Sequence, residues 1–295
     1  MPTITTTYRT PELTDGNIAG ETIGNLGSGD RVVFATNVDI ESVGRDNAAA
    51  AAFEVDSVDE ARVNNWAIGE DAKFTFGNGN DTINFNANRT GDITMVGRGG
   101  NDSLYSARGN DTLDGGAGDD LLVGRGGNDT LLGGAGKDDL RGGGGTDTLR
   151  GNGGDDVLDG GSGDDTLVGG QGNDELTGGA GTDTFTVTSQ AGKTDVITDF
   201  EFADEKINVN GVNAVSSITH SDIGGGGTRI VFENGYTLDL NGVDENEFTF
   251  ANNAGRIDIA GSTDPVDPVD PVDPDPEPNT DLGGVNGDFF SLLYG

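Results

Sequence analysis

The chain has 295 residues, of which 52 are acidic and 16 are basic, so its formal net charge is −36 at pH 7. Such a charge repels phosphate groups, and nucleic acid is therefore not expected as a partner. The absence of cysteine excludes disulfides and thiol catalysis. No apolar run approaches the roughly 20 residues that a membrane-spanning helix needs.

Residues 1–96 are predicted to form irregular coils that cap a β-solenoid and begin its core. Short β-like runs, among them Lys73–Phe76 and Ile93–Val96, alternate with glycine and asparagine. Asp81 lies in a solitary GNGNDTI segment, a copy of the unit that repeats later, and is a weaker candidate for metal binding. Five consecutive alanines within residues 46–66 would allow a short helix there.

Residues 97–186 repeat with a period of nine. Each unit reads G-G-x-G-x-D-x-U-x, where U is apolar, and this nonapeptide is typical of calcium-binding β-helices. The predicted fold class is therefore all-β, a parallel β-roll or β-helix solenoid of stacked nonapeptide repeats. The candidate ligands at position 6 of the unit are Asp102, Asp111, Asp120, Asp129, Asp138, Asp147, Asp156, Asp165, Asp174 and Asp183. Those at position 4 are Gly100, Gly118, Gly127, Gly136, Gly145, Gly154, Gly163, Gly172 and Gly181.

These residues are predicted to bind Ca²⁺. Glycines permit turns whose carbonyls point toward one site, and the other three residues of each unit form a short strand that stacks in parallel. With two nonapeptides in each coil, Asp102 and Asp120 lie about 4.8 Å apart, where their charges repel each other. Calcium accepts about six to eight oxygen ligands at flexible angles, whereas magnesium requires a strict octahedron. Four gaps on each side of the solenoid predict about eight ions.

Some units depart from the pattern. Arg98, Arg125 and Asn152 replace the second glycine, although a glycine follows each of them. Residues 106–108, Ser-Ala-Arg, replace the opening of the second repeat. Sites that involve Asp111 are therefore expected to be weak.

The repeats resemble those of RTX proteins, the hemolysin-type calcium-binding repeat family that Gram-negative bacteria export by type I secretion. Residues 183–207 are similar to the module that follows the repeats in serralysin-type secreted proteases, whose protease domain this chain lacks. The resemblance implies an extracellular or cell-surface location and the type I secretion machinery as a partner. A chain that requires calcium to fold would stay largely unfolded inside the cell and fold outside, where calcium is millimolar.

Residues 187–261 are predicted to form a β-rich cap. Thr228–Phe232 and Tyr236–Leu240 flank a Glu-Asn-Gly turn and suggest a hairpin. A cap is needed because the open end of a solenoid exposes unpaired strand edges. Asp195 and Asp199 either extend the calcium ladder or are solvated turn residues, two alternatives of about equal weight.

The C-terminal stretches differ in composition from the rest. Residues 262–279 repeat Pro-Val-Asp and predict a polyproline II spacer of roughly 45 Å. Residues 280–295 form an apolar tail that serves as a secretion signal, as a docking peptide for another copy, or as both; a frayed tail without a partner is the third alternative. The docking candidates in this tail are Phe289, Phe290, Leu292, Leu293 and Tyr294.

The chain is not expected to be an enzyme. Its single histidine, His220, excludes a zinc site of the H-E-x-x-H type and is expected to lie in a loop. The G-x-S-x-G motif of serine hydrolases is absent from the sequence. We expect a calcium-dependent extracellular structural protein that assembles with itself into a bacterial surface layer, filament or matrix. The alternatives are a secreted adhesin or glycan-binding module and, with less support, a noncatalytic part of a secreted enzyme.

Overall fold

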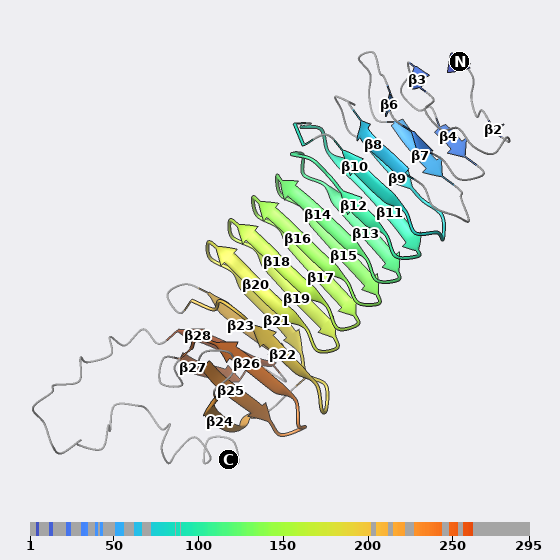
Figure 1. Cartoon of the computed structure of the whole chain (residues 1–295). Helices are drawn as coiled ribbons and strands as arrows, with labels where there is room; N and C mark the ends of the chain where they lie inside the picture. Colours follow the sequence, from blue (N-terminus) through green and yellow to red (C-terminus); the bar gives the residue numbers. More distant parts are fainter. Residues whose placement is uncertain are drawn as a thin grey trace, which may run out of the picture.

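The structure is a computed structural model and consists of strands stacked into an elongated solenoid (Figure 1). It describes residues 73–85, 87–88, 90–201, 205–211 and 227–243 with their side chains, and beyond these only the backbone of strands. The expected spacer and the docking tail, residues 262–295, lie outside the described residues. Within the described part of the chain, no helix is long and apolar enough to cross a membrane.

Each coil of the repeat region contains two strands, one in each of two long sheets of 12 and 13 strands. Neighbours in a sheet are parallel and 18 residues apart, as in the pair Leu113 and Leu131. Two nonapeptides therefore form one coil, as the period predicts. The strands are β11 (Ile93–Gly99), β12 (Ser103–Tyr105), β13 (Thr112–Ala117), β14 (Leu121–Gly126), β15 (Thr130–Ala135), β16 (Asp139–Gly144), β17 (Thr148–Gly153), β18 (Val157–Ser162), β19 (Thr166–Gln171), β20 (Glu175–Ala180) and β21 (Thr184–Thr188).

The regular strands have six residues, so the prediction of three-residue strands was wrong. The parallel ladder continues through positions 2 and 3 of the following unit, where Gly116 pairs with Gly134 and Ala117 with Ala135. Glycine at position 2 adopts positive φ, +104° at Gly116, and still remains in register with its neighbour. Only the segment before each aspartate makes the turn.

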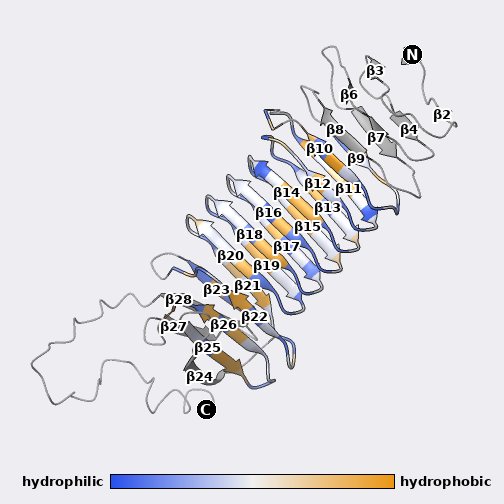
Figure 2. Cartoon of the chain, in the orientation of Figure 1, coloured by the Kyte–Doolittle hydropathy of each residue, from blue (hydrophilic) through white to orange (hydrophobic). Residues whose placement is uncertain are grey.

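The apolar residue at position 8 forms the core of the solenoid. Its members are fully buried between the two sheets, from Leu104 to Leu176 and then Phe185. Figure 2 shows them as an orange stripe along the stack. Side chains alternate between the two faces of a strand, and each regular six-residue strand therefore contributes one large side chain to the interior, its second inward position being glycine. Burial of a leucine stabilises by about 1.5–3 kcal/mol, so a single coil has too small a core to fold by itself.

The solenoid extends toward the N-terminus. Strands β9 (Ala72–Thr75) and β10 (Thr82–Phe85) pair in parallel with β11 and β12, and aromatic side chains replace leucine in their core. The rings of Phe74 and Phe85 lie 5.0 Å apart. The short helix expected within residues 46–66 was wrong: β7 (Ala51–Val55) and β8 (Arg62–Trp66) run there and join the same stack.

Further toward the N-terminus, the structure describes only the backbone of short strands. They are β1 (Ile4–Thr5), β2 (Glu12–Leu13), β3 (Thr22–Gly24), β4 (Arg31–Phe34), β5 (Asp39–Ile40) and β6 (Ser42–Val43). Strand β4 pairs in parallel with β7, and β5 pairs in parallel with β8, so the stack continues into this region.

At the other end, the parallel stack changes to antiparallel pairing. Strands β22 (Thr194–Ile197) and β23 (Lys206–Asn210) continue the two sheets in parallel. Strands β25 (Gly227–Phe232) and β26 (Thr237–Asn241) form the expected hairpin. Strand β24 (Val215–Ser221) pairs with β25 in the same sheet, whereas β28 (Arg256–Gly261) and β27 (Phe248–Asn252) extend the other sheet beyond β23. His220 lies in β24, so its expected place in a loop was wrong.

Candidate metal centre

The repeat aspartates form a hydrogen-bonded ladder along each side of the solenoid. From Asp102 to Asp165, the backbone N–H of each repeat aspartate donates to Oδ1 of the aspartate one coil further on, at 2.7 Å from Asp102 to Asp120 and 3.0 Å from Asp156 to Asp174. All ten carboxylates are at most 3% exposed. Asp81 is also buried, and its N–H donates to Asp102 Oδ1 at 2.7 Å. Each carboxylate is thus held in a fixed orientation by its first oxygen.

The second oxygen, Oδ2, is buried in the ladder. Among the described residues, Oδ2 has no hydrogen-bond partner in Asp102, Asp120, Asp129, Asp138, Asp147, Asp156, Asp165, Asp174 and Asp183. A buried carboxylate oxygen without a partner is strongly unfavourable. A run of nine such atoms indicates that a cation belongs beside them.

Burial also raises the pKa values of these carboxyls. Desolvation is the largest cause and raises the pKa of Asp102, Asp129, Asp156 and Asp165 to about 7 and that of Asp138 to about 6. Neighbouring aspartates in the ladder add to the increase, while the backbone hydrogen bond opposes it. At neutral pH, the folded ladder therefore requires either protons or cations.

Glycine at position 1 of the unit leaves the space in which Oδ2 lies. A methyl group on Gly97 would come within 2.1 Å of Asp102 Oδ2 and 2.5 Å of the Gly115 carbonyl oxygen in the next coil. For Gly142, the same two distances are 2.4 Å to Asp147 Oδ2 and 2.7 Å to the Gly160 carbonyl oxygen. A carboxylate oxygen thus lies beside each position-1 glycine, together with a carbonyl oxygen of the next coil at Gly97, Gly124 and Gly142 among others, and only glycine fits there.

Positions 2 and 4 of the unit direct further carbonyls along the stack. A methyl group on Gly118, at position 4, would lie 1.9 Å from the Gly100 carbonyl oxygen, and φ of Gly118 is +133°. The nine predicted glycines at this position all have φ between +107° and +146°. Arg98, Arg125 and Asn152 replace glycine at position 2 yet keep φ at +72° to +75°. These three departures from the pattern therefore preserve the turn.

The junctions suit calcium. The candidate ligand atoms are carboxylate and carbonyl oxygens, the hard ligands that Ca²⁺ accepts in flexible numbers and angles. Within the described residues, no three His, Cys, Asp or Glu side chains are grouped as a metal site. An ion here would be held by Oδ2 together with backbone carbonyls of adjacent turns. Such an ion would neutralise the buried carboxylates and join successive coils.

Comparison with protein families agrees with this geometry. The model of the RTX calcium-binding nonapeptide repeat matches four copies, at residues 96–131, 114–149, 132–167 and 150–185. The chain carries RTX repeats. RTX repeats bind Ca²⁺ and are typical of secreted proteins. No curated protein is similar enough to this chain to count as a match. The matched RTX region ends at residue 185, so the similarity of the following module to serralysin-type proteases stays a prediction.

The RTX repeats contain a second ladder that the sequence analysis missed. At position 5, Asn101 Oδ1 accepts the N–H of Asp119 at 3.0 Å, and Asp119 Oδ1 accepts the N–H of Lys137 at 2.8 Å. This ladder points in the opposite direction to the aspartate ladder and lies at the surface. Lys137 and Thr146 interrupt it because neither has a side-chain carbonyl or carboxylate oxygen. The signal was present, since seven of the ten position-5 residues are Asn or Asp.

The aspartate ladder ends differently on each side. Asp195 is buried and accepts the N–H of Asp174 on Oδ1 at 2.9 Å and the Tyr236 hydroxyl on Oδ2 at 2.6 Å. Asp195 therefore continues the ladder, and the alternative of a solvated turn residue was wrong for it. Asp199 accepts the N–H groups of Gly178 and Gly179 at 2.9 and 2.8 Å.

Glu205 follows Asp183 on the other side of the solenoid. Its neighbour Lys206 pairs with Thr184 in the parallel ladder, which places Glu205 at the level of Asp183 in the register. Glu205 is buried, and desolvation raises the pKa of its carboxyl to about 7, with further increases from Asp183 and Asp199. Glu205 therefore takes on this side the place that Asp195 takes on the other.

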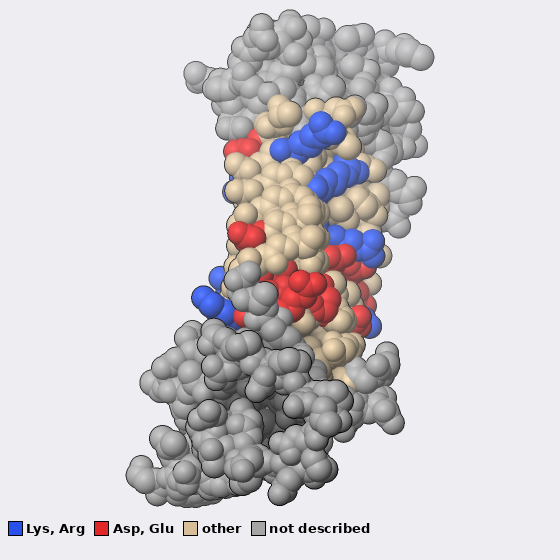
Figure 3. Space-filling view, turned by 90° about the vertical axis from the view of Figure 1, so that its left-hand side faces the viewer, with Lys and Arg blue, Asp and Glu red and all other residues tan. Residues whose placement is uncertain are grey.

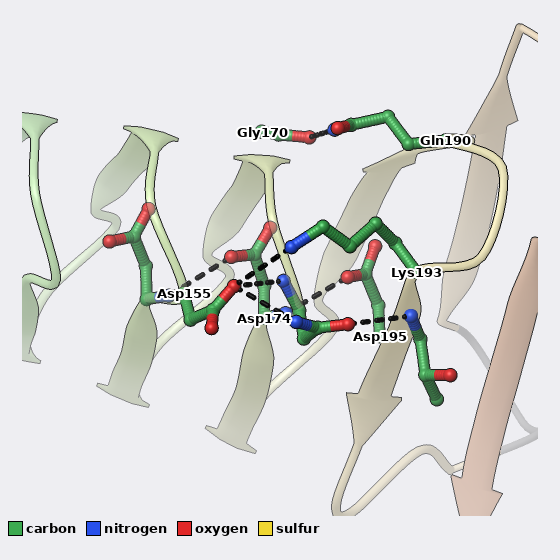
Figure 4. A network of polar contacts seen from close by, with 9 residues as sticks. Asp155, Gly170, Asp174, Gln190, Lys193 and Asp195 are labelled. Carbon is green, nitrogen blue, oxygen red and sulfur yellow. Dashed lines mark hydrogen bonds and ion pairs between the residues drawn. The ribbon is translucent and has the colours of Figure 1, made fainter.

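A polar network fastens the loop after β21 to the last coils (Figure 4). Lys193 Nζ lies 3.4 Å from Asp155 Oδ1, and Gln190 donates to the Gly170 carbonyl at 3.3 Å. On the face seen in Figure 3, acidic side chains gather toward the C-terminal end of the described surface. These exposed charges are distinct from the buried ladder.

Proposed function

We propose that this chain is a calcium-dependent extracellular structural protein that assembles with itself into a surface layer, filament or matrix. The observation that supports it best is the set of nine buried Oδ2 atoms without a hydrogen-bond partner in the described residues. Calcium that binds only the folded chain contributes its binding free energy to folding. The chain is then unfolded during export by the type I secretion machinery and folds outside the cell.

The structural role is supported by how the repeat residues are used. The leucines fill the core, and the aspartates and glycines form the junctions between coils. The result is a long body without the histidine, cysteine and serine motifs of hydrolases. The docking tail, Phe289 to Tyr294, would connect one such body to the next through the spacer. We therefore assign the chain no catalytic activity.

The test is a calcium titration of the purified full chain from EDTA into millimolar calcium. Circular dichroism reports strand formation, while light scattering and electron microscopy report assembly. Strands and ordered polymers are expected to appear over the same calcium range. A variant that lacks residues 280–295 should fold at the same calcium concentration and remain monomeric. Folding of the full chain without assembly would reject the structural role and support the alternative, an adhesin or glycan-binding module.

A further inference from the structure

One junction between coils differs from the others. Along the sheet that contains β10, β12, β14 and β16, the residues at position 1 are Phe85, Ser106, Gly124 and Gly142. Ser106 is the one non-glycine residue at position 1 within the ten repeats, and it is fully buried. Its side chain therefore occupies the space that a glycine leaves at the other junctions.

The Ser106 side chain satisfies the carbonyl of the next coil. Ser106 Oγ donates to the Gly124 carbonyl oxygen at 2.6 Å. At the regular junction one coil further on, the corresponding Gly142 carbonyl oxygen lies 2.7 Å from the place where a methyl group on Gly124 would be, beside Asp129 Oδ2. A hydroxyl donor thus stands at Ser106 where the regular junction presents only acceptors.

The carboxylate of this junction is also satisfied by the chain. Ala107 N–H donates to Asp111 Oδ2 at 3.2 Å. Ala107 replaces the position-2 glycine and is not among the residues with positive φ, so its turn differs from that of the regular repeats. In the nine ladder carboxylates from Asp102 to Asp183 other than Asp111, Oδ2 has no such donor among the described residues.

Arg125 supplies a positive charge at the preceding junction, between the Phe85 and Ser106 coils. Its Nη1 donates at 2.7 Å to the carbonyl oxygens of both Phe85 and Ser106, and its Nη2 donates at 2.8 Å to Asn84 Oδ1. The guanidinium also lies 5.8 Å from the centre of the Tyr105 ring. One arginine therefore connects three successive coils through the position-1 carbonyls, which elsewhere lie beside a ladder carboxylate.

We propose that the junction between the Ser106 and Gly124 coils binds no calcium, because Ser106 Oγ and Ala107 N–H already occupy its carbonyl and carboxylate oxygens, while Arg125 braces the preceding junction through the carbonyls of Phe85 and Ser106. The remaining junctions between position-1 glycines bind calcium, so the count falls from about eight ions to seven. This inference rests on the calcium binding of the proposed function. According to this inference, one junction near the N-terminal end of the repeats is stable without a bound metal.

The experiment changes the closed junction into a regular one, changes a regular junction into a closed one, and counts the calcium ions that each variant binds. The variant Ser106→Gly/Ala107→Gly/Arg125→Gly restores the regular unit and should bind one calcium more than the wild type. The reverse variant, Gly142→Ser/Gly143→Ala, places the two residues of the closed junction in a regular coil and should bind one fewer. Asn152→Gly is the matched control, because Asn152 also has positive φ at position 2 but is exposed. It should leave the count unchanged.

Calcium per chain is measured by isothermal titration and by atomic emission after gel filtration, with circular dichroism to verify folding. An equal count in wild type and triple variant, both folded, would overturn the inference. If the triple variant does not fold, the reverse variant decides alone: a folded reverse variant with an unchanged count also overturns it. A wild type that binds no calcium would instead reject the proposed function.

Discussion

The regular coils of this solenoid differ from the two irregular junctions, at Asp111 and at Asp195, in how they accommodate a buried aspartate carboxylate. In the regular coils, Oδ2 of each aspartate is buried without a hydrogen-bond partner among the described residues. At the joints, protein groups reach the second oxygen: Ala107 N–H at Asp111 and the Tyr236 hydroxyl at Asp195. A backbone N–H or a side-chain hydroxyl thus reaches this oxygen where the regular repeat is interrupted or ends. In the regular repeats that the structure describes, the unit supplies no such donor to Oδ2, which is why we propose that its folding depends on calcium.

The largest expected effect is the reversal of pH dependence when calcium is removed. Burial raises the pKa of Asp102, Asp129, Asp156 and Asp165 to about 7, above the value near 4 of an unfolded aspartate. A raised carboxyl pKa stabilises the folded chain fully below about pH 4, and this stabilisation is lost as the pH rises through about 7. In EDTA, the strand signal in circular dichroism should be strongest near pH 4 and disappear by neutral pH.

With saturating calcium, the dependence should have the opposite sign, because protons compete with the ion for the same oxygens. Urea unfolding at several pH values, with and without calcium, measures both dependences. Equal stability at pH 4 and pH 7.5 in EDTA would show that the ladder carboxylates do not control folding.

The substitution Gly142→Ala should have the next largest effect. The new methyl group would lie 2.4 Å from Asp147 Oδ2 and 2.7 Å from the Gly160 carbonyl oxygen, so the junction must open. Overpacking costs about 1–3 kcal/mol, and the loss of one bound ion adds to it. Urea unfolding in millimolar calcium measures the free energy, and isothermal titration measures the lost ion.

Gly153→Ala is the control for Gly142→Ala. Its methyl group would meet the nearest atom, the Gly134 carbonyl oxygen, at an ordinary 3.7 Å. Position 3 already carries alanine at Ala117 and Ala135. If both variants lose the same stability, the effect comes from backbone freedom and not from the space beside the carboxylate.

A smaller effect is expected at the C-terminal joint. Tyr236→Phe removes the hydroxyl that donates to Asp195 Oδ2 at 2.6 Å and leaves a buried carboxylate oxygen without its donor. The cost should be about 1–3 kcal/mol in the free energy of unfolding. Tyr105→Phe, at a half-exposed tyrosine, should cost less than about 0.5 kcal/mol. A gain of one calcium by Tyr236→Phe would show that the hydroxyl had replaced an ion, whereas equal losses in both variants would contradict a special role for Tyr236.

The sequence predicted the regular part of the molecule because that part is periodic. A nine-residue period determines which leucines are buried and which aspartates stack, and both expectations agree with the structure. The sequence also marked Ser106 and Arg125 as departures. It could not show that Arg125 reaches the carbonyl of Phe85, because that contact depends on the register of three coils, including an irregular one. The contact between Asp195 and Tyr236 spans 41 residues and required the hairpin to be placed.

The smallest expected effect separates buried charge from exposed charge. Lys193 and Asp155 form an ion pair at 3.4 Å, but their side chains are 39% and 53% exposed. Water and salt screen such a pair, so Lys193→Ala should cost at most about 1 kcal/mol, and less at high ionic strength. Urea unfolding in calcium at two salt concentrations measures this cost. A loss above about 2 kcal/mol would mean that this loop fastens the last coils as firmly as the buried ladder does. A small loss would indicate that stability depends on the buried ladder carboxylates and their cations, and not on the number of acidic residues at the surface.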